Sequence, residues 1–389
     1  IKQIEETRKN GATHIVAIMS GNYVQRGDVA IVNKFERAKI AVNHGVDLVV
    51  ELPVVYSLAS AEMFARAGIM MLGALGCVDG ISFGSECGDI NLLKNAAMAS
   101  LTAANPDKIK PLLEQGIPFP QAIQQIIAQE NGPLIAGVFD SPNNTLAVEY
   151  IKAMKILGLD KMDIFTVLRT GAGHDSMMAT DNIASGSLLR QMIEDNEDIS
   201  EYVPKDMADL IKRYDDDDFL AYFDNLERPL LYKLRTCTPQ ELADTPDVGQ
   251  GLHNRLFEMG RMSASLDQFL DNVNTKRYTM AKIRRIILNL LIGIKNTDLQ
   301  MPPSYGRVLA FNDRGAEILK KSKEAEKTKY SIPFEVSLKD LLDLKLPQIG
   351  RFADLTTRST DIYGLASREI APSALDFTAK IEIQGKNEG

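Results

Sequence analysis

Asp47-Leu48-Val49-Val50-Glu51-Leu52 is a short, nearly continuous aliphatic run, and helical patterns flank it on both sides. Residues 34–43 and 59–75 carry Ala, Leu, Ile and Met at helical spacing, and Gly45 and Gly76 stand where each helix is expected to end. Similar aliphatic runs occupy residues 14–19, 80–83 and 163–168. Near-continuous apolar strands separated by helices predict a parallel sheet covered on both faces. The first half is therefore expected to be a doubly wound α/β domain.

The pattern changes after Glu197, where short helices with charged loops begin and runs typical of parallel strands become rare. Because single hydrophobic cores stop growing near roughly 250–300 residues, we expect two domains, over residues 1–197 and 198–389. The second is expected to be mainly helical, with residues 308–311 as a candidate strand. The acidic run 215–218 is interpreted as a solvated turn or helix cap, since adjacent carboxylates cannot all face one metal ion.

The composition limits the classes of function. With 44 Lys and Arg against 52 Asp and Glu, the formal net charge is -8, so any nucleic-acid site must be a local basic patch. Cys77, Cys87 and Cys237 are far apart and form no C-x-x-C pair, which argues against a disulfide framework or structural zinc and fits a reducing cytoplasm. No apolar run is long enough to span a bilayer, and residues 286–294 are interpreted as a buried helix.

In open α/β sheets, ligands bind beyond the carboxyl ends of the strands, which draws attention to the loops that follow them. The first loop is Ser20-Gly21-Asn22-Tyr23-Val24-Gln25-Arg26-Gly27, where Gly21 permits a close backbone approach and Arg26 can hold a phosphate or carboxylate. A plain Gly-bounded turn accounts for it equally well. The second loop, Phe83-Gly84-Ser85-Glu86, places the small Gly84 where a flat base can pack, although Gly is common at such turns.

Three further segments carry candidate site residues. Asn143 belongs to Ser141-Pro142-Asn143-Asn144, ahead of a helix expected to begin near Thr145, where Asn is usually a cap. Arg169 opens a loop that also contains His174, for which an exposed loop position is the commoner role. Ser185-Gly186-Ser187 opens a helix with Arg190 one turn in, and helix N-termini of this kind suit phosphate oxygens.

A basic segment lies in the second half. Its cations fall within ten positions without an acid among them, and they are Lys276, Arg277, Lys282, Arg284 and Arg285. On a helix, Arg284 and Arg285 can share a face while the isoleucines between residues 283 and 287 pack inward, and such a face suits an RNA backbone. An ordinary amphipathic helix with a charged exterior fits the same residues. A second candidate patch, Lys320 to Lys329, is diluted by acids.

These loops occur together in an order that resembles the bacterial tRNA(Met) cytidine acetate ligases, a branch of the nucleotidylyltransferase superfamily. The resemblance covers nearly the whole chain and implies a HUP/Rossmann-like fold for the first domain. The motifs that carry it are Ser20-Gly21-x-x-x-Gln25-Arg26-Gly27, Phe83-Gly84-Ser85-Glu86, Pro142-Asn143-Asn144, the loop opened by Arg169, and Ala184-Ser185-x-Ser187-x-x-Arg190.

The resemblance implies a cytoplasmic enzyme that uses ATP and Mg²⁺ to convert acetate into acetyl-adenylate. The exocyclic amine of the wobble cytidine of elongator tRNA(Met) then attacks the acetyl group, giving N4-acetylcytidine. The residues implied for catalysis are Ser185, Ser187 and Arg190, and those for ATP binding are Gly84, Asn143 and Arg169, which Ser20 and Gly21 are expected to join. The basic segment from Lys276 to Arg285 is expected to bind the tRNA.

The same resemblance places a first signature of the Asn-Pro-Phe-His-Asn-Gly-His type, together with the first strand of the sheet, immediately before Ile1. Histidines of that signature contact the phosphates and stabilise charge on the displaced group. The 389 residues are therefore expected to hold only part of the active site.

Two other hypotheses remain open. A small-metabolite nucleotidylyltransferase, which joins AMP to a phosphate-bearing substrate, uses the same ATP-binding loops, but the large second half with its basic segment argues against it. A non-catalytic RNA- or protein-binding module on a degenerate nucleotide fold is less compatible with Ser185, Ser187 and Arg190.

Overall fold

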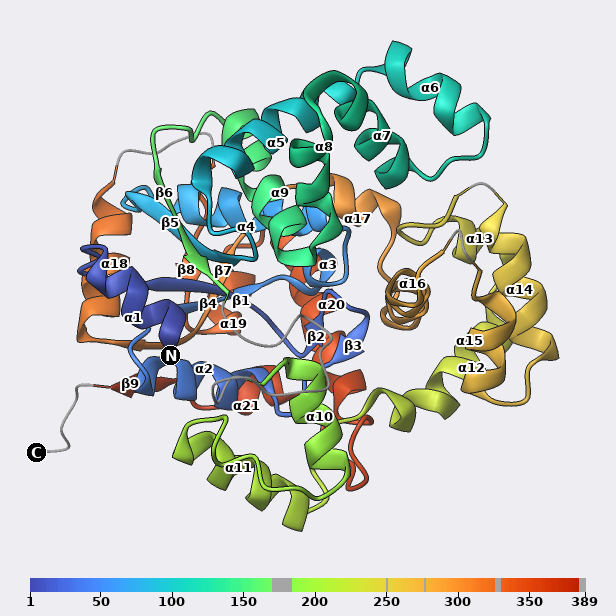
Figure 1. Cartoon of the computed structure of the whole chain (residues 1–389). Coiled ribbons are helices and arrows are strands. Elements are labelled where there is room, and N and C mark those ends of the chain that lie inside the picture. Colours follow the sequence, from blue (N-terminus) through green and yellow to red (C-terminus); the bar gives the residue numbers. More distant parts are fainter. Residues whose placement is uncertain (170–183, 250, 276–277, 326–329, 385–389) are drawn as a thin grey trace, which may run out of the picture. The chain divides into compact units, whose positions relative to one another are not determined.

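The computed structural model describes residues 1–169, 184–249, 251–275, 278–325 and 330–384 (Figure 1). The chain forms two compact units, of which unit 1 comprises Ile1–Thr13 and Cys77–Pro204, and unit 2 comprises His14–Gly76 and Lys205–Gly389. The break after Pro204 lies close to the expected boundary at 197. Residues 14–76, however, pack with the carboxyl-terminal half, so the functional division into 1–197 and 198–389 stays a prediction.

Unit 1 is built on two parallel strands covered by helices. Its elements are α1 (Lys2–Lys9), β5 (Gly80–Ser85), α5 (Ile90–Ala103), α6 (Pro106–Glu114), α7 (Phe119–Asn131), α8 (Pro133–Ala136), η1 (Gly137–Asp140), α9 (Pro142–Leu157), β6 (Asp163–Leu168) and α10 (Gly186–Glu194). β5 and β6 pair in register from Gly80 with Asp163 to Ser85 with Leu168. Helices α1, α5 and α9 pack against these strands. Since the strands are parallel, their carboxyl ends, and the loops that follow, lie at one edge.

Unit 2 is a mixed sheet followed by many helices. The elements from its first segment are β1 (Val16–Ser20), β2 (Tyr23–Val24), β3 (Asp28–Val29), α2 (Lys34–Asn43), β4 (Leu48–Leu52), α3 (Val54–Ser57) and α4 (Ala61–Ala74). Those from its second segment are α11 (Lys205–Asp216), η2 (Phe223–Leu226), α12 (Glu227–Thr236), α13 (Pro239–Ala243), α14 (Leu252–Met262), α15 (Leu266–Val273), α16 (Met280–Ile292), α17 (Asn296–Gln300), β7 (Gly306–Asn312), α18 (Asp313–Glu324), β8 (Phe334–Glu335), α19 (Leu338–Asp343), α20 (Pro347–Tyr363), α21 (Leu375–Thr378) and β9 (Glu382–Gln384).

The sheet of unit 2 joins strands from both segments. β1 pairs in parallel with β4, and β7 pairs antiparallel with the other side of β4. β8 and β9 both pair in parallel with β7. All five residues of β4 are buried, as its near-continuous apolar run predicts for a central strand. The expected α/β fold is confirmed, and the candidate strand at 308–311 is confirmed as β7, which makes the sheet mixed.

The expected helical character of the second half is also confirmed. α12, α14, α15 and α16 pack on one another (Figure 1). The apolar side of α16 is buried, including Ile283, Ile286 and Ile287. The acidic run 215–218 forms the exposed end of α11 and the turn after it. Among the described helices, none is long and apolar enough to cross a membrane.

Asp47 precedes β4 and forms hydrogen bonds to the start of β1 and the end of β7. Its carboxylate accepts the Ile15 backbone N–H at 2.7 Å and the Asn312 side-chain amide at 3.0 Å. Its backbone oxygen accepts the Asn312 N–H at 3.0 Å. A Cβ at Gly315, in the first turn of α18, would overlap that oxygen and lie 2.8 Å from the Cβ of Phe311. Only glycine therefore lets α18 start so close to the sheet.

We expect Gly315→Ala to lower the free energy of unfolding by about 1–3 kcal/mol, because the added methyl group forces backbone atoms apart. The matched control is Gly350→Ala in α20, where a Cβ meets nothing within 4 Å. That change should be neutral or stabilising by about 0.5–1 kcal/mol. Urea unfolding followed by circular dichroism measures both, and equal effects of the two substitutions would contradict the close-approach argument.

Candidate functional site

The loop after β5 and the first turn of α9 hold each other through reciprocal hydrogen bonds. The Glu86 carboxylate accepts the Asn143 side-chain amide at 2.6 Å, the Asn143 backbone N–H at 3.2 Å and the Asn144 backbone N–H at 2.7 Å. Asn144 is 5% exposed, and its Oδ1 accepts the backbone N–H groups of Glu86 at 2.9 Å and Cys87 at 3.1 Å. Glu86 thus caps α9 from another loop, and the helix begins at Pro142 rather than near Thr145.

These bonds also set the ionisation of Glu86. Partial burial disfavours its charged form, but the donors from Asn143 and Asn144 outweigh that effect and hold the pKa of Glu86 below its usual value. The carboxylate is therefore ionised at neutral pH. Its negative charge lies at the N-terminus of α9, where the helix dipole favours it.

Gly84 and Arg169 are neighbours at the same edge of unit 1. The Arg169 backbone N–H donates to the Ser85 oxygen at 2.9 Å, continuing the β5–β6 pairing. A Cβ at Gly84 would lie 3.3 Å from Cγ of Arg169, so the glycine leaves room for the aliphatic part of that side chain. Together with the Glu86–Asn143 bond, the structure brings Gly84, Asn143 and Arg169 to the carboxyl ends of β5 and β6. Their contact with ATP stays a prediction.

The Ser185 motif forms a helix N-terminus, as its sequence predicts. Ser185 is the N-cap of α10, 4% exposed, and its hydroxyl accepts the Leu188 N–H at 3.0 Å. Ser187 and Arg190 are half-buried in the first two turns. His174 lies outside the described residues, as does the rest of the stretch 170–183.

Ser20 and Gly21 belong to unit 2, where β1 ends. A Cβ at Gly21 would overlap the Glu51 carboxylate of β4, which Lys34 binds, so a larger residue here would displace that carboxylate. Arg37 of α2 donates to the backbone oxygens of Ser20, at 3.0 Å, and of Gly21. The loop is thus held in place by charged side chains from the next helix and strand, and its role in ATP binding stays a prediction.

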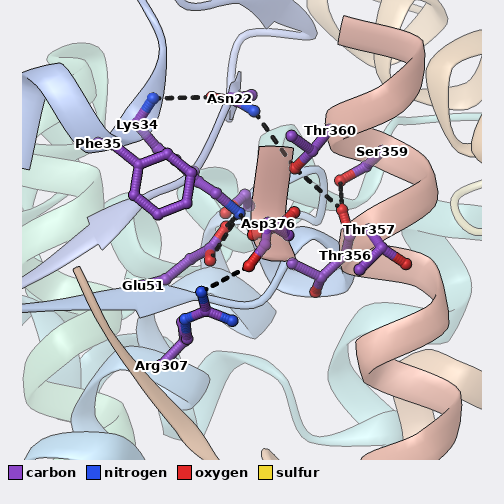
Figure 2. A network of polar contacts seen from close by, with 12 residues as sticks. Asn22, Lys34, Phe35, Glu51, Arg307, Thr356, Thr357, Ser359, Thr360 and Asp376 are labelled. Atoms are coloured by element: carbon purple, nitrogen blue, oxygen red, sulfur yellow. Dashed lines mark hydrogen bonds and ion pairs between the residues drawn. The ribbon is translucent and has the colours of Figure 1, made fainter. Parts of the chain in front are cut away.

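Behind this loop lies a buried cluster of charges, shown in Figure 2. Lys34 Nζ donates to both carboxylate oxygens of Glu51 at 2.9 Å and forms an ion pair with Asp376 Oδ1 at 2.7 Å. Arg307 Nη2 donates to the backbone oxygen of Asp376 at 2.8 Å. All four residues are at most 4% exposed. Burial opposes the charge of Lys34, but its two carboxylate partners prevail and raise the pKa of Lys34, so the ammonium stays charged.

Helix α20 supports the same loop from the carboxyl-terminal part of the chain. Asn22 donates to Thr360 Oγ1 at 3.4 Å and accepts the Lys34 backbone N–H at 2.8 Å (Figure 2). The Tyr23 hydroxyl donates to the Ser359 oxygen at 3.0 Å. Sequence reasoning missed this support. The signal that could have revealed it is Glu51, a charged residue inside an otherwise apolar strand.

The predicted basic face of α16 has internal partners. Arg284 lies 3.8 Å from Asp28 and 4.5 Å from the centroid of the Phe223 ring. Arg285 pairs with Asp247 at 3.2 Å and donates to the Gln25 oxygen at 3.2 Å. The Lys282 ammonium lies 5.3 Å from the Tyr278 ring centroid. Lys276 and Arg277 lie outside the described residues, and RNA contact by this segment stays a prediction.

We expect Glu86→Gln to loosen the start of α9, since a neutral amide replaces a carboxylate that accepts three N–H bonds. At pH 7 the local opening free energy should fall by about 1–2 kcal/mol, measured by hydrogen exchange of the Asn144 amide. Because the folded pKa of Glu86 is lowered, its contribution is present above the unfolded pKa of about 4.3 and is lost as the pH falls through the folded pKa.

The difference between wild type and Glu86→Gln should therefore narrow below about pH 4. Glu130→Gln is the control, because Glu130 pairs with Lys108 at 2.7 Å while partly exposed. It should change stability by about 0.5 kcal/mol at most. A pH-independent effect of Glu86→Gln would contradict the carboxylate cap.

We expect Lys34→Met to lower the free energy of unfolding by about 3–5 kcal/mol, because it leaves Glu51 and Asp376 buried without their cation. Lys39→Met, on the exposed side of the same helix, should stay within about 0.5 kcal/mol of wild type. Thermal and urea unfolding of both variants test this, and a loss as small as that of the control would show that the cluster is not required.

Comparisons with known proteins agree with the motifs. The HIGH Nucleotidyl Transferase family model matches residues 1–376. The tRNA(Met) cytidine acetate ligase of Alkaliphilus metalliredigens is 33% identical, over 95% of this chain and 92% of that protein. The ligase of the same name from Acetivibrio thermocellus is 30% identical, over 98% of this chain and 95% of that protein.

Solved structures give the same result. The crystal structure of apo Thermotoga maritima TmcAL matches 98% of this chain and 95% of its own with a TM-score of 0.88 and 26% identity. A form bound with alpha-thio ATP matches with a TM-score of 0.87. Because sequence and fold agree over nearly the full length, the chain belongs to the tRNA(Met) cytidine acetate ligase family of HIGH nucleotidyl transferases.

Proposed function

We propose that this protein activates acetate with ATP as acetyl-adenylate and transfers the acetyl group to the wobble cytidine of elongator tRNA(Met), giving N4-acetylcytidine. The observation that carries the proposal is the match to named tRNA(Met) cytidine acetate ligases over nearly the whole chain. The ATP analogue in the Thermotoga maritima structure supports ATP as the activating substrate. A tRNA-modifying enzyme of this kind works in the cytoplasm, where its tRNA and ATP are found.

The residues of unit 1 fit a nucleotide. Gly84 leaves room for the aliphatic part of Arg169, so that this cation lies at the carboxyl ends of β5 and β6, where nucleotides bind in such sheets. The N-terminus of α10 combines a helix dipole with the hydroxyls of Ser185 and Ser187, and Arg190 follows one turn in. Such a terminus suits phosphate oxygens, and Mg²⁺ usually binds ATP through those phosphates with several waters retained.

Charge neutralisation is the main catalytic task in this chemistry. The acetate carboxylate attacks the α-phosphate, the bond to pyrophosphate breaks, and acetyl-adenylate forms. Arg169 and Arg190 are the cations of unit 1 assigned to screening the negative charge on the phosphates, while Ser185 and Ser187 donate hydrogen bonds to them. The cytidine amine then attacks the acetyl carbonyl and AMP leaves, which requires an unstacked base, as anticodon loops offer.

The test is acetate-dependent exchange of labelled pyrophosphate into ATP, in a chain that carries an Asn-Pro-Phe-His-Asn-Gly-His-type loop before Ile1 and in the 389-residue chain. We expect exchange in the extended chain and a fall of roughly 100-fold or more with Arg190→Ala, because a group that stabilises transferring charge is lost. Lys94→Ala, an exposed cation on α5, is the control and should exchange normally.

Exchange that ignores acetate but responds to a phosphorylated metabolite would favour a small-metabolite nucleotidylyltransferase instead. If no carboxylate supports pyrophosphate exchange, the ligase function is overturned.

A further inference from the structure

RNA binding requires cations whose charge is not already neutralised within the protein. The two described arginines of the predicted α16 face have carboxylate partners in unit 2, Arg284 with Asp28 and Arg285 with Asp247. Their positive charge is therefore partly neutralised by ion pairs within the protein. With a net charge of -8, the chain attracts a polyanion only through local groups of cations that have no carboxylate partner.

Helix α12 presents such a patch. Arg228, Tyr232 and Arg235 are spaced four and three residues apart, so they share one face of the helix, and all three are exposed. The opposite face, with Leu230, Leu231 and Leu234, is buried. Tyr232 is 70% exposed, so most of this large aromatic residue is open to solvent.

The carboxyl end of α14 lies beside the carboxyl end of α12. Arg235 Nη2 donates to the Ser263 oxygen at 2.9 Å, and Arg261 Nη2 donates to the Cys237 oxygen at 3.2 Å, so the ends of the two helices lie side by side. A Cβ at Gly260 would lie 3.1 Å from Cβ of Leu234, which shows how closely the helices pack. Met262, next to Arg261, is 72% exposed.

The guanidinium group of Arg261 is stacked on an aromatic ring. Its guanidinium carbon lies 3.4 Å from the centroid of the Phe257 ring, one turn earlier in the same helix. Stacking of this kind fixes the plane of the guanidinium and leaves its other face to a further planar group. We call Arg228, Tyr232, Arg235, Arg261 and Met262 the α12–α14 surface.

Nearby carboxylates do not cancel this charge. Glu241 is bound by Lys233 at 2.8 Å and by the Thr238 backbone N–H at 2.9 Å. Glu227 accepts the Leu266 backbone N–H at 2.9 Å. Within the part of the chain that the structure describes, no carboxylate forms an ion pair with Arg228, Arg235 or Arg261. The hydrogen bonds of Arg235 and Arg261 to backbone oxygens at the helix ends give these two arginines a structural role. No such role is seen for Arg228 or the exposed Tyr232 within the described residues.

We propose that the α12–α14 surface is a docking site for tRNA, with its arginines on backbone phosphates and Tyr232 stacked on an unpaired base. The proposal rests on the proposed function and deepens it by naming where its RNA substrate is held. Charge favours RNA over a protein partner, because uncompensated cations interleaved with an exposed aromatic ring match a phosphate backbone with accessible bases. Single-stranded loops, such as those of tRNA, offer such bases.

The experiment titrates the 389-residue chain into fluorescently labelled elongator tRNA(Met) and follows anisotropy at several salt concentrations. Tyr232→Ala and Arg228→Gln carry the test, because neither side chain has an intramolecular partner within the described residues that its loss would break. Circular dichroism verifies that both variants fold. We expect Tyr232→Ala to weaken binding by about tenfold, through the lost stacking. Arg228→Gln should reduce the slope of log affinity against log salt by about 0.7–0.9, the value for one phosphate contact.

Lys212→Gln, at an exposed position of α11, is the matched control and should change affinity less than Arg228→Gln does. Unchanged affinity in Tyr232→Ala and Arg228→Gln, a loss in Lys212→Gln as large as theirs, or no binding of tRNA by the wild type would each overturn the proposal. Pyrophosphate exchange, measured in parallel in the extended chain, should not change in Tyr232→Ala. If exchange is absent while these variants still lose tRNA affinity, the catalytic function is wrong and the docking site stands.

Discussion

The bond between Lys34 and its two buried carboxylates is the interaction on which unit 2 depends. Lys34 begins α2, Glu51 lies in the central strand and Asp376 comes from the last helix, so one ammonium joins three parts of the chain (Figure 2). Charges with no access to water are tolerated only when they are paired and hydrogen-bonded. Because Asp376 belongs to α21, this helix completes the cluster that lies behind the loop at Ser20 and Gly21.

A similar arrangement holds the loops of unit 1. The Glu86 carboxylate satisfies backbone donors of α9, and Asn144 satisfies donors of the Glu86 loop, so neither segment reaches its position without the other. Both of these motifs were identified from the sequence as candidate ligand sites. Their polar residues serve first to fix the backbone, and a backbone fixed beforehand loses less entropy when a ligand binds. A structural role for Asn143 is thus compatible with contact to a nucleotide.

The sequence predicts the parts of this fold that local patterns determine. Strands β1, β4, β5 and β6, helices α2 and α4, and the candidate strand β7 follow from apolar runs, helical spacing and glycine stops. It does not predict the antiparallel pairing of β4 with β7, or the contact of Lys34 with Asp376, because these join residues that are remote in the chain and no local period records them. The loops at Gly84, Asn143 and Ser185 follow from their positions after strands and at helix starts, and the resemblance implies their roles. The bonds made by Glu86 and Glu51 require the structure.

The arginines show why charge pattern alone is a weak guide to RNA binding. The sequence around α16 shows no acid among its cations, but Asp28 pairs with Arg284 and Asp247 pairs with Arg285 from other segments of the chain. The cations of α12 and α14 are more scattered in sequence, and the packing of the two helices brings Arg235 and Arg261 to adjoining helix ends. Attraction of a polyanion depends on charge that remains after internal pairing, because a paired arginine must be released, at a cost, before it can displace counterions from phosphate. Tertiary structure, which decides the pairing, therefore determines how much of the charge of a basic helix remains to attract RNA.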